Sequence, residues 1–181
     1  MLTGGSGMER YRFKERLKNG LEVTIRAAKS DDGEKIRRAF KGLDRETVYR
    51  RFFRYKADVT DQELRRITEA NFKDDVALLA TVGSGEEEVV IGGASYFIVD
   101  PGPGARSAEM AFTVEEAYQG LGLGTCLMRH LIGIARERGL TRLEADVLAG
   151  NLPMLSVFRR SGLPLTTRPE GDVVHLLLKL G

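Results

Sequence analysis

The sequence predicts an α+β domain built on a mixed, mostly antiparallel sheet flanked by helices. Segments of alternating apolar and polar residues, separated by turns rich in Gly, Asn and Pro, fill much of the chain up to Val114. This pattern is typical of antiparallel strands. Beyond Val114 the apolar residues follow a helical period, and helices then alternate with strands as far as the C-terminus. Two to three early helices interrupt the first set of strands.

A hairpin and three helices are expected in the first 70 residues. The alternating segments Tyr11–Arg16 and Leu21–Arg26 are joined by Asn19-Gly20, and both of these residues tolerate the positive φ of a tight turn. Thr60 and Glu63 have the spacing of a capping box at a helix start. The expected helices run from a cap at Asp31 or Asp32 to Leu43, over Arg45–Arg54 and over Asp61–Ala70.

The later strands and helices are predicted from the same alternating and helical periods of the apolar residues. Strands are expected at Val76–Val82, Val89–Val99, Ala108–Val114, Arg142–Leu148 and Val173–Leu180. Helices are expected at Leu123–Arg138 and Asn151–Ser161, each followed by a glycine. The segment Met1–Gly7 is interpreted as a flexible leader, and residues 8–181 as one domain, because no interior composition shift marks a boundary.

Composition excludes several classes of protein. The 28 Lys and Arg residues nearly balance the 26 Asp and Glu residues, which argues against a nucleic-acid partner. The apolar runs are too short to cross a membrane, and no secretory signal is recognisable. The single cysteine, Cys126, favours a reducing cytoplasm. No metal site is expected, because His130 and His175 are far apart in the sequence.

The segment between Val114 and Thr125 is the most informative part of the chain. A strand ends at Val114, an acidic turn follows, and Gly120, Gly122 and Gly124 lead into a helix. Glycine lets the backbone turn tightly and lets a bulky anion come close. The start of a helix adds free N–H groups and the positive end of the helix dipole. These features predict a phosphate or pyrophosphate site, and the alternative is a turn that binds nothing.

The glycine spacing separates the kinds of phosphate ligand. A nucleoside-triphosphate loop ends in Gly-Lys-Ser/Thr, whereas Thr125 and Cys126 follow Gly124 here. A dinucleotide fingerprint reads G-x-G-x-x-G within a first βαβ unit, whereas this loop reads G-x-G-x-G and follows antiparallel strands. Glu144 lies where a ribose-binding acid would fall, so a dinucleotide stays open as an alternative.

At these residues the sequence resembles the GNAT superfamily of N-acyltransferases. The acyl-CoA loop of that superfamily has the form Gln/Arg-x-x-Gly-x-Gly/Ala, which Gln119, Gly122 and Gly124 match. The next motif of the superfamily is an Asn followed by a helix that ends in aromatic-x-x-x-Gly, and the segment Asn151–Gly162 has this spacing. The order of the expected elements also follows the superfamily, so the resemblance implies a GNAT-like fold.

The resemblance implies acetyl-CoA as cosubstrate, with no metal. The amides of the loop would hold the CoA pyrophosphate, and the strand before it would hydrogen-bond the pantetheine arm like an added strand. The implied cofactor-binding residues are Phe112, Thr113, Val114, Gln119, Gly120, Leu121, Gly122, Leu123, Gly124, Thr125, Asn151 and Phe158.

A narrower resemblance concerns the acceptor. Thr47-Val-Tyr-Arg-Arg-Phe-Phe53, the strand Ala108–Val114 and Asn151-Leu-Pro-Met154 are similar to bacterial protein-lysine acetyltransferases that modify acyl-CoA synthetases. This similarity implies a protein lysine as the acceptor and an acyl-CoA synthetase as a partner. The alternatives are acetylation of a small amine or a peptide N-terminus, and a non-catalytic acyl-CoA sensor.

Glu109 is the candidate general base. Direct attack by an amine needs a group that takes its proton and donors that stabilise the oxyanion of the thioester. Strand alternation places Glu109 on the face of Ala111 and Thr113, opposite the apolar face that includes Met110. The base role is carried mainly by the resemblance, and the alternative is a salt bridge with Arg106 or another neighbour. A backbone amide near Thr113–Val114 is the expected oxyanion donor.

Other residues are weaker candidates. Glu115 and Glu116 would either attract a cationic lysine or form a solvated turn. Phe158 stands where many relatives have a Tyr that would protonate the leaving thiolate, so either Tyr118 or water replaces it or the thiolate leaves unassisted. Cys126 lies in the first turn of a helix, where a thiol pKa can fall, but direct transfer is favoured over an acyl-cysteine intermediate.

Overall fold

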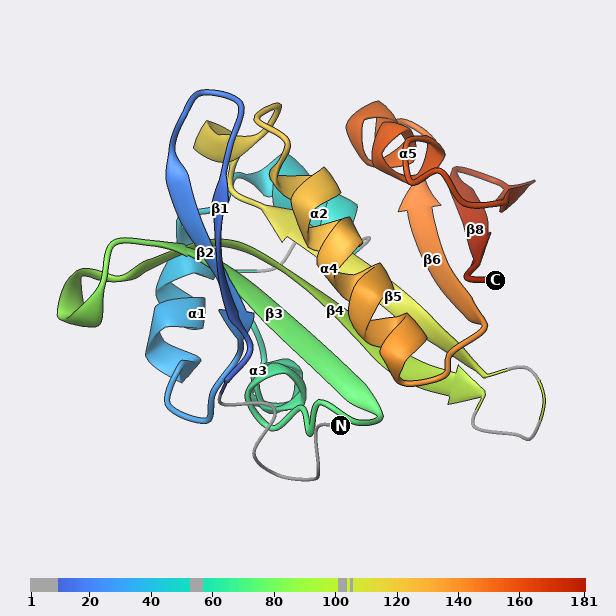
Figure 1. Ribbon diagram of the computed structural model, residues 1–181. Helices are drawn as coiled ribbons and strands as arrows, with labels where there is room; N and C mark the ends of the chain where they lie inside the picture. The colour runs from blue at the N-terminus through green and yellow to red at the C-terminus, as the bar shows by residue number, and fades with distance from the viewer. Residues whose placement is uncertain (1–9, 53–56, 101–103, 105) are drawn as a thin grey trace.

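The computed structural model describes residues 10–52, 57–100, 104 and 106–181. Within these residues eight strands form one sheet in the order β1-β2-β3-β4-β5-β6-β8-β7. Neighbouring strands are antiparallel except for β5 and β6, which are parallel. The expected mixed, mostly antiparallel sheet flanked by helices is confirmed (Figure 1).

The elements follow one another as β1 Arg12–Arg16, β2 Glu22–Ala27, α1 Gly33–Lys41, α2 Arg45–Phe52, α3 Asp61–Thr68, β3 Asp75–Val82, β4 Val89–Asp100, β5 Ser107–Val114, α4 Leu123–Glu137, β6 Arg142–Leu148, α5 Leu152–Arg159, β7 Leu165–Glu170 and β8 Val173–Lys179. Short 3₁₀ turns at Gly85–Glu87 and Glu116–Tyr118 precede β4 and the glycine loop. No described helix is both long enough and apolar enough to span a bilayer.

The two faces of the sheet carry separate cores. Figure 1 shows α4 crossing the front of the sheet, with α2 on the opposite side. On β3 the residues alternate between the cores: Leu78 joins the larger cluster with α4 and α5, whereas Ala77 and Leu79 join a smaller one with Ile36 of α1. The same alternation on β5 sends Met110 into the α4 core and leaves Glu109 on the α1–α3 side, as expected from its period of two.

Local signals explain most element boundaries. Thr60 and Glu63 form the expected capping box at the start of α3. Asp32 is the N-cap residue of α1, but its carboxylate makes no capping hydrogen bond, because it pairs with Arg26 instead. Three expectations concern residues outside the described part of the chain: the end of the second helix at Arg54, Phe53 of the motif that begins at Thr47, and the leader 1–7.

The strand β7 is a correction to the sequence analysis, which leaves Leu165–Glu170 as a connection. All but one of its residues are exposed, and it contains Pro169, so it lacks the apolar alternation that marks a strand. It pairs with β8 at the edge of the sheet, where a proline is tolerated because its missing N–H faces no partner strand.

Candidate functional site

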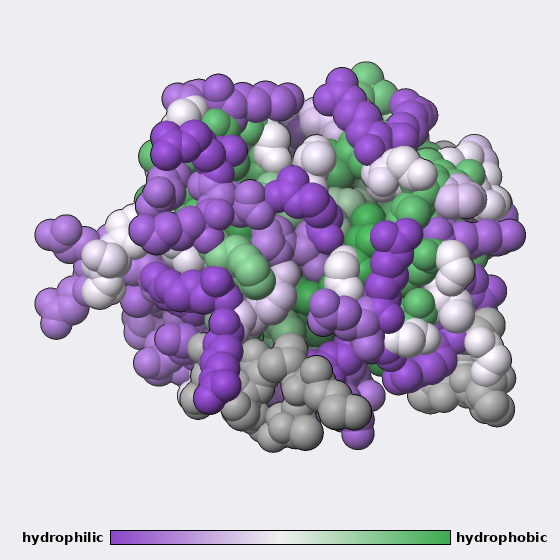
Figure 2. Space-filling model, viewed as in Figure 1, coloured by the Kyte–Doolittle hydropathy of each residue, from purple (hydrophilic) through white to green (hydrophobic). Residues whose placement is uncertain are grey.

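A cleft opens where β5 and β6 part. The two strands pair only over Ser107–Glu109 and Arg142–Glu144, and among the described residues they make no ladder contact beyond this point. The cavity between them has a volume of about 680 Å³ and is bounded by the glycine loop, α2 and α5 as well. In Figure 2, apolar side chains gather between α4 and β6 within a hydrophilic surround.

The edge of β5 that faces the cleft presents backbone amides to it. Glu115 N–H donates to the carbonyl of Ile91 in β4 at 2.9 Å. Residues that bond to one neighbour alternate along an antiparallel strand, so Thr113 also directs its amide to β4, whereas Phe112 and Val114 direct theirs away from it. The Val114 carbonyl agrees with this direction, because it accepts a hydrogen bond from Gln119 Nε2 at 2.9 Å. Of the Thr113–Val114 pair, Val114 is therefore the residue whose amide points toward the cleft, and its role as oxyanion donor stays a prediction.

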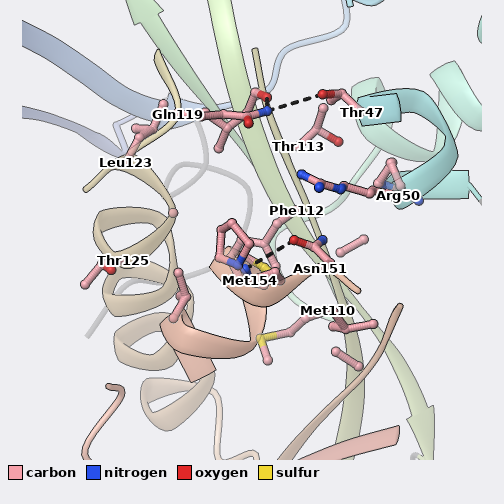
Figure 3. Close-up of a pocket in the computed structure, with 18 of the residues that line it drawn as sticks. Thr47, Arg50, Met110, Phe112, Thr113, Gln119, Leu123, Thr125, Asn151 and Met154 are labelled. Carbon is pink, nitrogen blue, oxygen red and sulfur yellow. Dashed lines mark hydrogen bonds between the residues drawn. The ribbon is translucent and has the colours of Figure 1, made fainter. Parts of the chain in front are cut away.

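Gln119 fixes the start of the glycine loop. Its Nε2 donates to Val114 O and also to Thr47 Oγ1 at 3.2 Å, so it ties the loop both to β5 and to α2 (Figure 3). Gly120 and Gly122 follow with φ of +77° and +92°, which L side chains rarely adopt. Gly122 is the N-cap of α4, so the loop delivers the start of that helix to the cleft.

Gly124 serves a different purpose from the other two glycines. It is helical, and a Cβ at this position would lie 3.4 Å from Val157 Cγ2 and 3.6 Å from Met154 Cε in α5. Its missing side chain therefore lets α4 and α5 approach each other behind the loop. The sequence gives the three glycines the same expected role, whereas in the structure two have positive φ and the third allows close helix packing.

The predicted cofactor residues are brought together with two exceptions. Phe112, Thr113, Val114, Gln119, Gly120, Gly122, Leu123, Gly124, Thr125 and Asn151 all line the cleft. Leu121 lies on the outer side of the loop, where its carbonyl accepts the Lys18 N–H at 3.0 Å. Phe158 is fully buried and meets Phe112 edge to face at 6.1 Å, so it stands behind the cleft wall.

Asn151 has a local structural role in addition to its place in the cleft. It is the N-cap of α5, and its Oδ1 accepts the Met154 N–H at 3.3 Å (Figure 3). The side-chain amide nitrogen is the part of Asn151 left for a ligand. A contact between Asn151 and the cofactor stays a prediction.

Glu109 lies on the face of β5 that is turned toward the α1–α3 layer. Its side chain is exposed, lines the cavity and stands opposite Phe97 of β4 in the sheet. Within the described residues Glu109 forms no ion pair, and Arg106 donates instead to the Arg138 carbonyl at 3.0 Å. Arg51 is the nearby cation: burial lowers its pKa, and the charges of Glu63 and Glu109 act in the opposite direction.

The two other acidic candidates are directed elsewhere. Glu116 accepts the Asp44 N–H at 2.8 Å, and Asp44 in turn caps α2 through Thr47 N–H at 2.7 Å. Glu115 borders an apolar cavity beneath α1 and does not line the cleft. Of the three carboxylates, Glu109 is thus the one that faces the cleft.

Cys126 is poorly suited to act as a nucleophile. It is buried, and burial raises its pKa to about 11. The sequence analysis compares only the two histidines, but Cys126 and His130 are one helical turn apart and their ligand atoms lie within 4.8 Å of the Glu15 carboxylate. Glu15 accepts hydrogen bonds from His130 Nε2 and Arg129, each at 2.7 Å, so this cluster already joins β1 to α4.

Sequence reasoning missed four cations around the cleft: Lys18, Arg50, Arg51 and Arg160. Arg50 extends from α2 toward β5 in Figure 3. The acceptor motif that starts at Thr47 contains Arg50 and Arg51 and was the available signal for them. Lys18 and Arg160 come from the β1–β2 turn and the end of α5, and no local pattern connects these segments to the loop.

Comparison with known proteins identifies relatives over this same region. The sequence profile described as "Acetyltransferase (GNAT) family" matches residues 45–163. The chain is 29% identical to the acetyltransferase PA5475 of Pseudomonas aeruginosa over 174 residues, which cover 95% of this chain and 92% of that protein. It is 37% identical to the acetyltransferase Pat of Mycolicibacterium smegmatis over 117 residues, which cover 65% of this chain but only 34% of that protein.

Solved structures share the fold. The GNAT domain of S. lividans PAT superposes with a TM-score of 0.84 at 30% identity, over 93% of this chain and 96% of that domain. A cAMP-binding acyltransferase from Mycobacterium smegmatis superposes with a TM-score of 0.62 at 26% identity, over 94% of this chain and 47% of that longer one. The chain belongs to the GNAT acetyltransferase family.

Proposed function

We propose that this chain transfers an acetyl group from acetyl-CoA to a lysine side chain of a protein by direct attack. The observation that carries the proposal is the meeting, in one cleft, of the outward-facing amides of β5, the left-handed glycine loop and the carboxylate of Glu109. The single cysteine supports a reducing cytoplasm as the place where it acts.

The cofactor side of the cleft suits an extended ligand that ends in phosphates. The amides of Phe112 and Val114 can pair with the amide groups of a pantetheine arm as a strand would. The start of α4 then offers N–H donors and a positive dipole to the pyrophosphate. The side chain of Lys18 lies beside Gly122, where an added Cβ would come within 3.5 Å of Lys18 Cε. The Lys18 ammonium adds a positive charge beside the loop.

The acceptor side suits a cationic amine that must lose its proton. A lysine ammonium has a pKa of about 10.4, so near neutral pH a base has to remove the proton before attack. Glu109 holds a carboxylate at the foot of the cleft for this step. The amine nitrogen then bonds to the thioester carbon, the Val114 amide holds the oxyanion, and the C–S bond breaks to release the thiolate. That thiolate needs little assistance, because a thiol pKa is about 8.5.

A protein lysine is favoured by the relatives. The chain matches the acetyltransferase Pat and the GNAT domain of S. lividans PAT over the cleft region. The acceptor motif at Thr47 and the strand of Glu109 carry the similarity to protein-lysine acetyltransferases. Acyl-CoA synthetases are therefore the first class of protein to test as substrate.

Thiol release from acetyl-CoA tests the proposal, with an acyl-CoA synthetase and a panel of polyamines as competing acceptors. We expect release that depends on the synthetase, with an acetylated lysine found by peptide mass spectrometry. Turnover on polyamines alone would assign a small-amine acceptor. Tight CoA binding with no turnover on any acceptor would favour a sensor.

Glu109→Gln is expected to lower turnover roughly 10²–10³-fold while CoA affinity stays unchanged, the usual size of a general-base effect. Glu116→Gln is the matched control: it is the same chemical change in the same region, and its amide oxygen can still accept from Asp44 N–H. Equal activity of the two variants would remove Glu109 from the mechanism.

A further inference from the structure

A second cavity adjoins the acceptor side of the cleft. It has a volume of about 110 Å³ and lies between α1 and the strands β3, β4 and β5. Ile36, Ala39, Phe40 and Leu43 form its outer wall. Arg51 and Glu115 are the charged side chains in its described lining, and the rest is almost wholly apolar.

This apolar cavity shares part of its wall with the cleft. Four residues line both spaces, and we name them the gate: Arg51, Phe52, Ala111 and Thr113. The two gate residues on β5 flank Phe112, whose amide faces the cleft, and Thr113 directly precedes Val114, the favoured oxyanion donor. A thioester held there would place its acyl carbon next to the gate.

The gate residues that belong to the sheet have small side chains. Ala111 and Thr113 are small, and they share the α1–α3 face with Gly93 of β4, which pairs with Thr113. Among the gate residues of β5, therefore, no bulky side chain closes the passage from the thioester to the cavity. Phe52 and Arg51 form the gate on the helix side.

We propose that this cavity receives the aliphatic chain of acyl groups longer than acetyl, so that the enzyme uses short- and medium-chain acyl-CoA thioesters. The inference rests on the proposed function for the position of the thioester. At roughly 30 Å³ for a group of water or methylene size, the cavity holds about three to four carbons beyond the acetyl methyl. Charged acyl termini fit it poorly, because its inner lining is apolar and a buried unpaired carboxylate is costly.

The position and the apolar lining of the cavity favour an acyl chain as its occupant. The acyl chain of a thioester held at the Val114 amide would begin beside the gate, next to the cavity. An aliphatic chain also gains from leaving water, by about fourfold in affinity for each buried methylene. Straight-chain thioesters with four to six carbons are thus the class that the cavity fits best.

Equilibrium binding of acetyl-, butanoyl-, hexanoyl- and decanoyl-CoA tests the proposal without any acceptor, so its outcome does not depend on whether the acceptor is identified. We expect the dissociation constant to fall at least tenfold from acetyl-CoA to the best chain, between four and six carbons, and to level off or rise at ten. Where an acceptor is turned over, kcat/KM should follow the same order. Affinity that is flat or declines from acetyl-CoA onward would overturn the proposal.

Ala39→Leu should fill the cavity from α1, because Ala39 lines it and does not line the cleft. We expect acetyl-CoA affinity to stay within about twofold, and the advantage of the longer chains to disappear. If filling raises thermal stability and leaves the chain-length profile unchanged, the cavity is a packing defect and the proposal fails.

A pair of truncations covers the case in which Ala39→Leu does not fold. Leu43→Ala enlarges the cavity and should move the preferred chain toward more carbons. Leu64→Ala is the matched control, because it packs in the same helix layer but does not line the cavity. An identical shift, or no shift, in both variants contradicts the assignment.

Discussion

Replacing Glu88 should remove a large share of the stability of the contact between α1 and the sheet. Arg26 in β2 is buried and donates to both Asp32 and Glu88 at 2.7–3.2 Å. Lys35 of α1 and Thr81 of β3 also donate to Glu88, at 2.9 and 3.1 Å. The cluster therefore joins the start of α1 to β2, to β3 and to the residue that precedes β4. Because α1 forms the outer wall of the apolar cavity, the cluster also supports the proposed acyl site.

The magnitude follows from the pKa of Glu88. Burial alone would raise this pKa, but the hydrogen bonds from Arg26 and Lys35 and the charge of Arg26 outweigh it and lower the pKa from 4.5 to about 2. A pKa that is lower in the folded than in the unfolded protein adds stability above the unfolded value, which is lost as the pH falls through the folded value. At about 1.4 kcal/mol per pH unit, the ion contributes about 3 kcal/mol at pH 7, and the loss falls between pH 4.5 and pH 2.

Glu88→Gln is therefore expected to lower the free energy of unfolding by about 3 kcal/mol at pH 7, since Arg26 keeps Asp32 but loses its second carboxylate. For a chain of this length that corresponds to roughly 6–12 °C in the unfolding temperature. The variant should also lose less stability than the wild type between pH 5 and pH 3. Urea unfolding at a series of pH values measures both effects.

The matched control is Glu22→Gln, which removes a carboxylate paired with Lys14 at 3.1 Å on the surface. The side chains of this pair are 72% and 53% exposed, and such pairs contribute less than about 1 kcal/mol. If Glu88→Gln costs no more than Glu22→Gln and the two pH profiles run parallel, the reasoning about the buried cluster is wrong.

Three further variants test the cleft. Gly122→Asp should weaken CoA binding at least tenfold, because it adds a negative charge at the helix start and strains a φ of +92°. The control is Gly171→Asp, which has a φ of +61° in an open turn. Equal CoA affinity in the two variants would remove the loop from the site. Cys126→Ser should keep most activity because the thiol pKa is about 11, and trapping an acetylated Cys126 at a competent rate would overturn direct transfer. Phe158→Tyr should leave turnover unchanged and cost about 1–3 kcal/mol of stability, since the hydroxyl that it introduces is buried. A hundredfold rise in turnover would show that thiolate departure limits the reaction.

The sequence predicts the fold well where local chemistry decides the structure. The Thr60–Glu63 box and the glycines before α4 work through their immediate neighbours, so their signals are complete within a few residues. The strand β7 is missed because it is an exposed edge, where pairing with β8 replaces burial as the stabilising interaction. Apolar alternation reports burial, and an edge strand with little burial gives no such signal.

The site is predicted less completely because several of its contacts join distant segments. Gln119 is found through its motif, but its bond to Thr47 spans 72 positions, and so does the bond from Asp44 N–H to Glu116. The second bond removes Glu116 from the list of acceptor-binding candidates, which strand period and charge alone cannot do. Phe158 is found by its spacing, but only the packing against Phe112 places it behind the wall of the cleft.

The geometry of β5 directs its backbone edge and its two side-chain faces toward three different surroundings. Its backbone edge faces the gap toward β6, its even-numbered side chains such as Met110 enter the α4 core, and its odd-numbered side chains from Glu109 to Thr113 face the α1–α3 layer. A cofactor bound along this edge would place its thioester beside Ala111 and Thr113, and Glu109 stands further along the same face of the strand. A shift of one residue in the β4–β5 register would bury Glu109 and turn Met110 toward the acceptor. Fixing that register, through bonds between the two strands such as the one from Glu115 N–H to the Ile91 carbonyl, is therefore a requirement of the chemistry as well as of the fold.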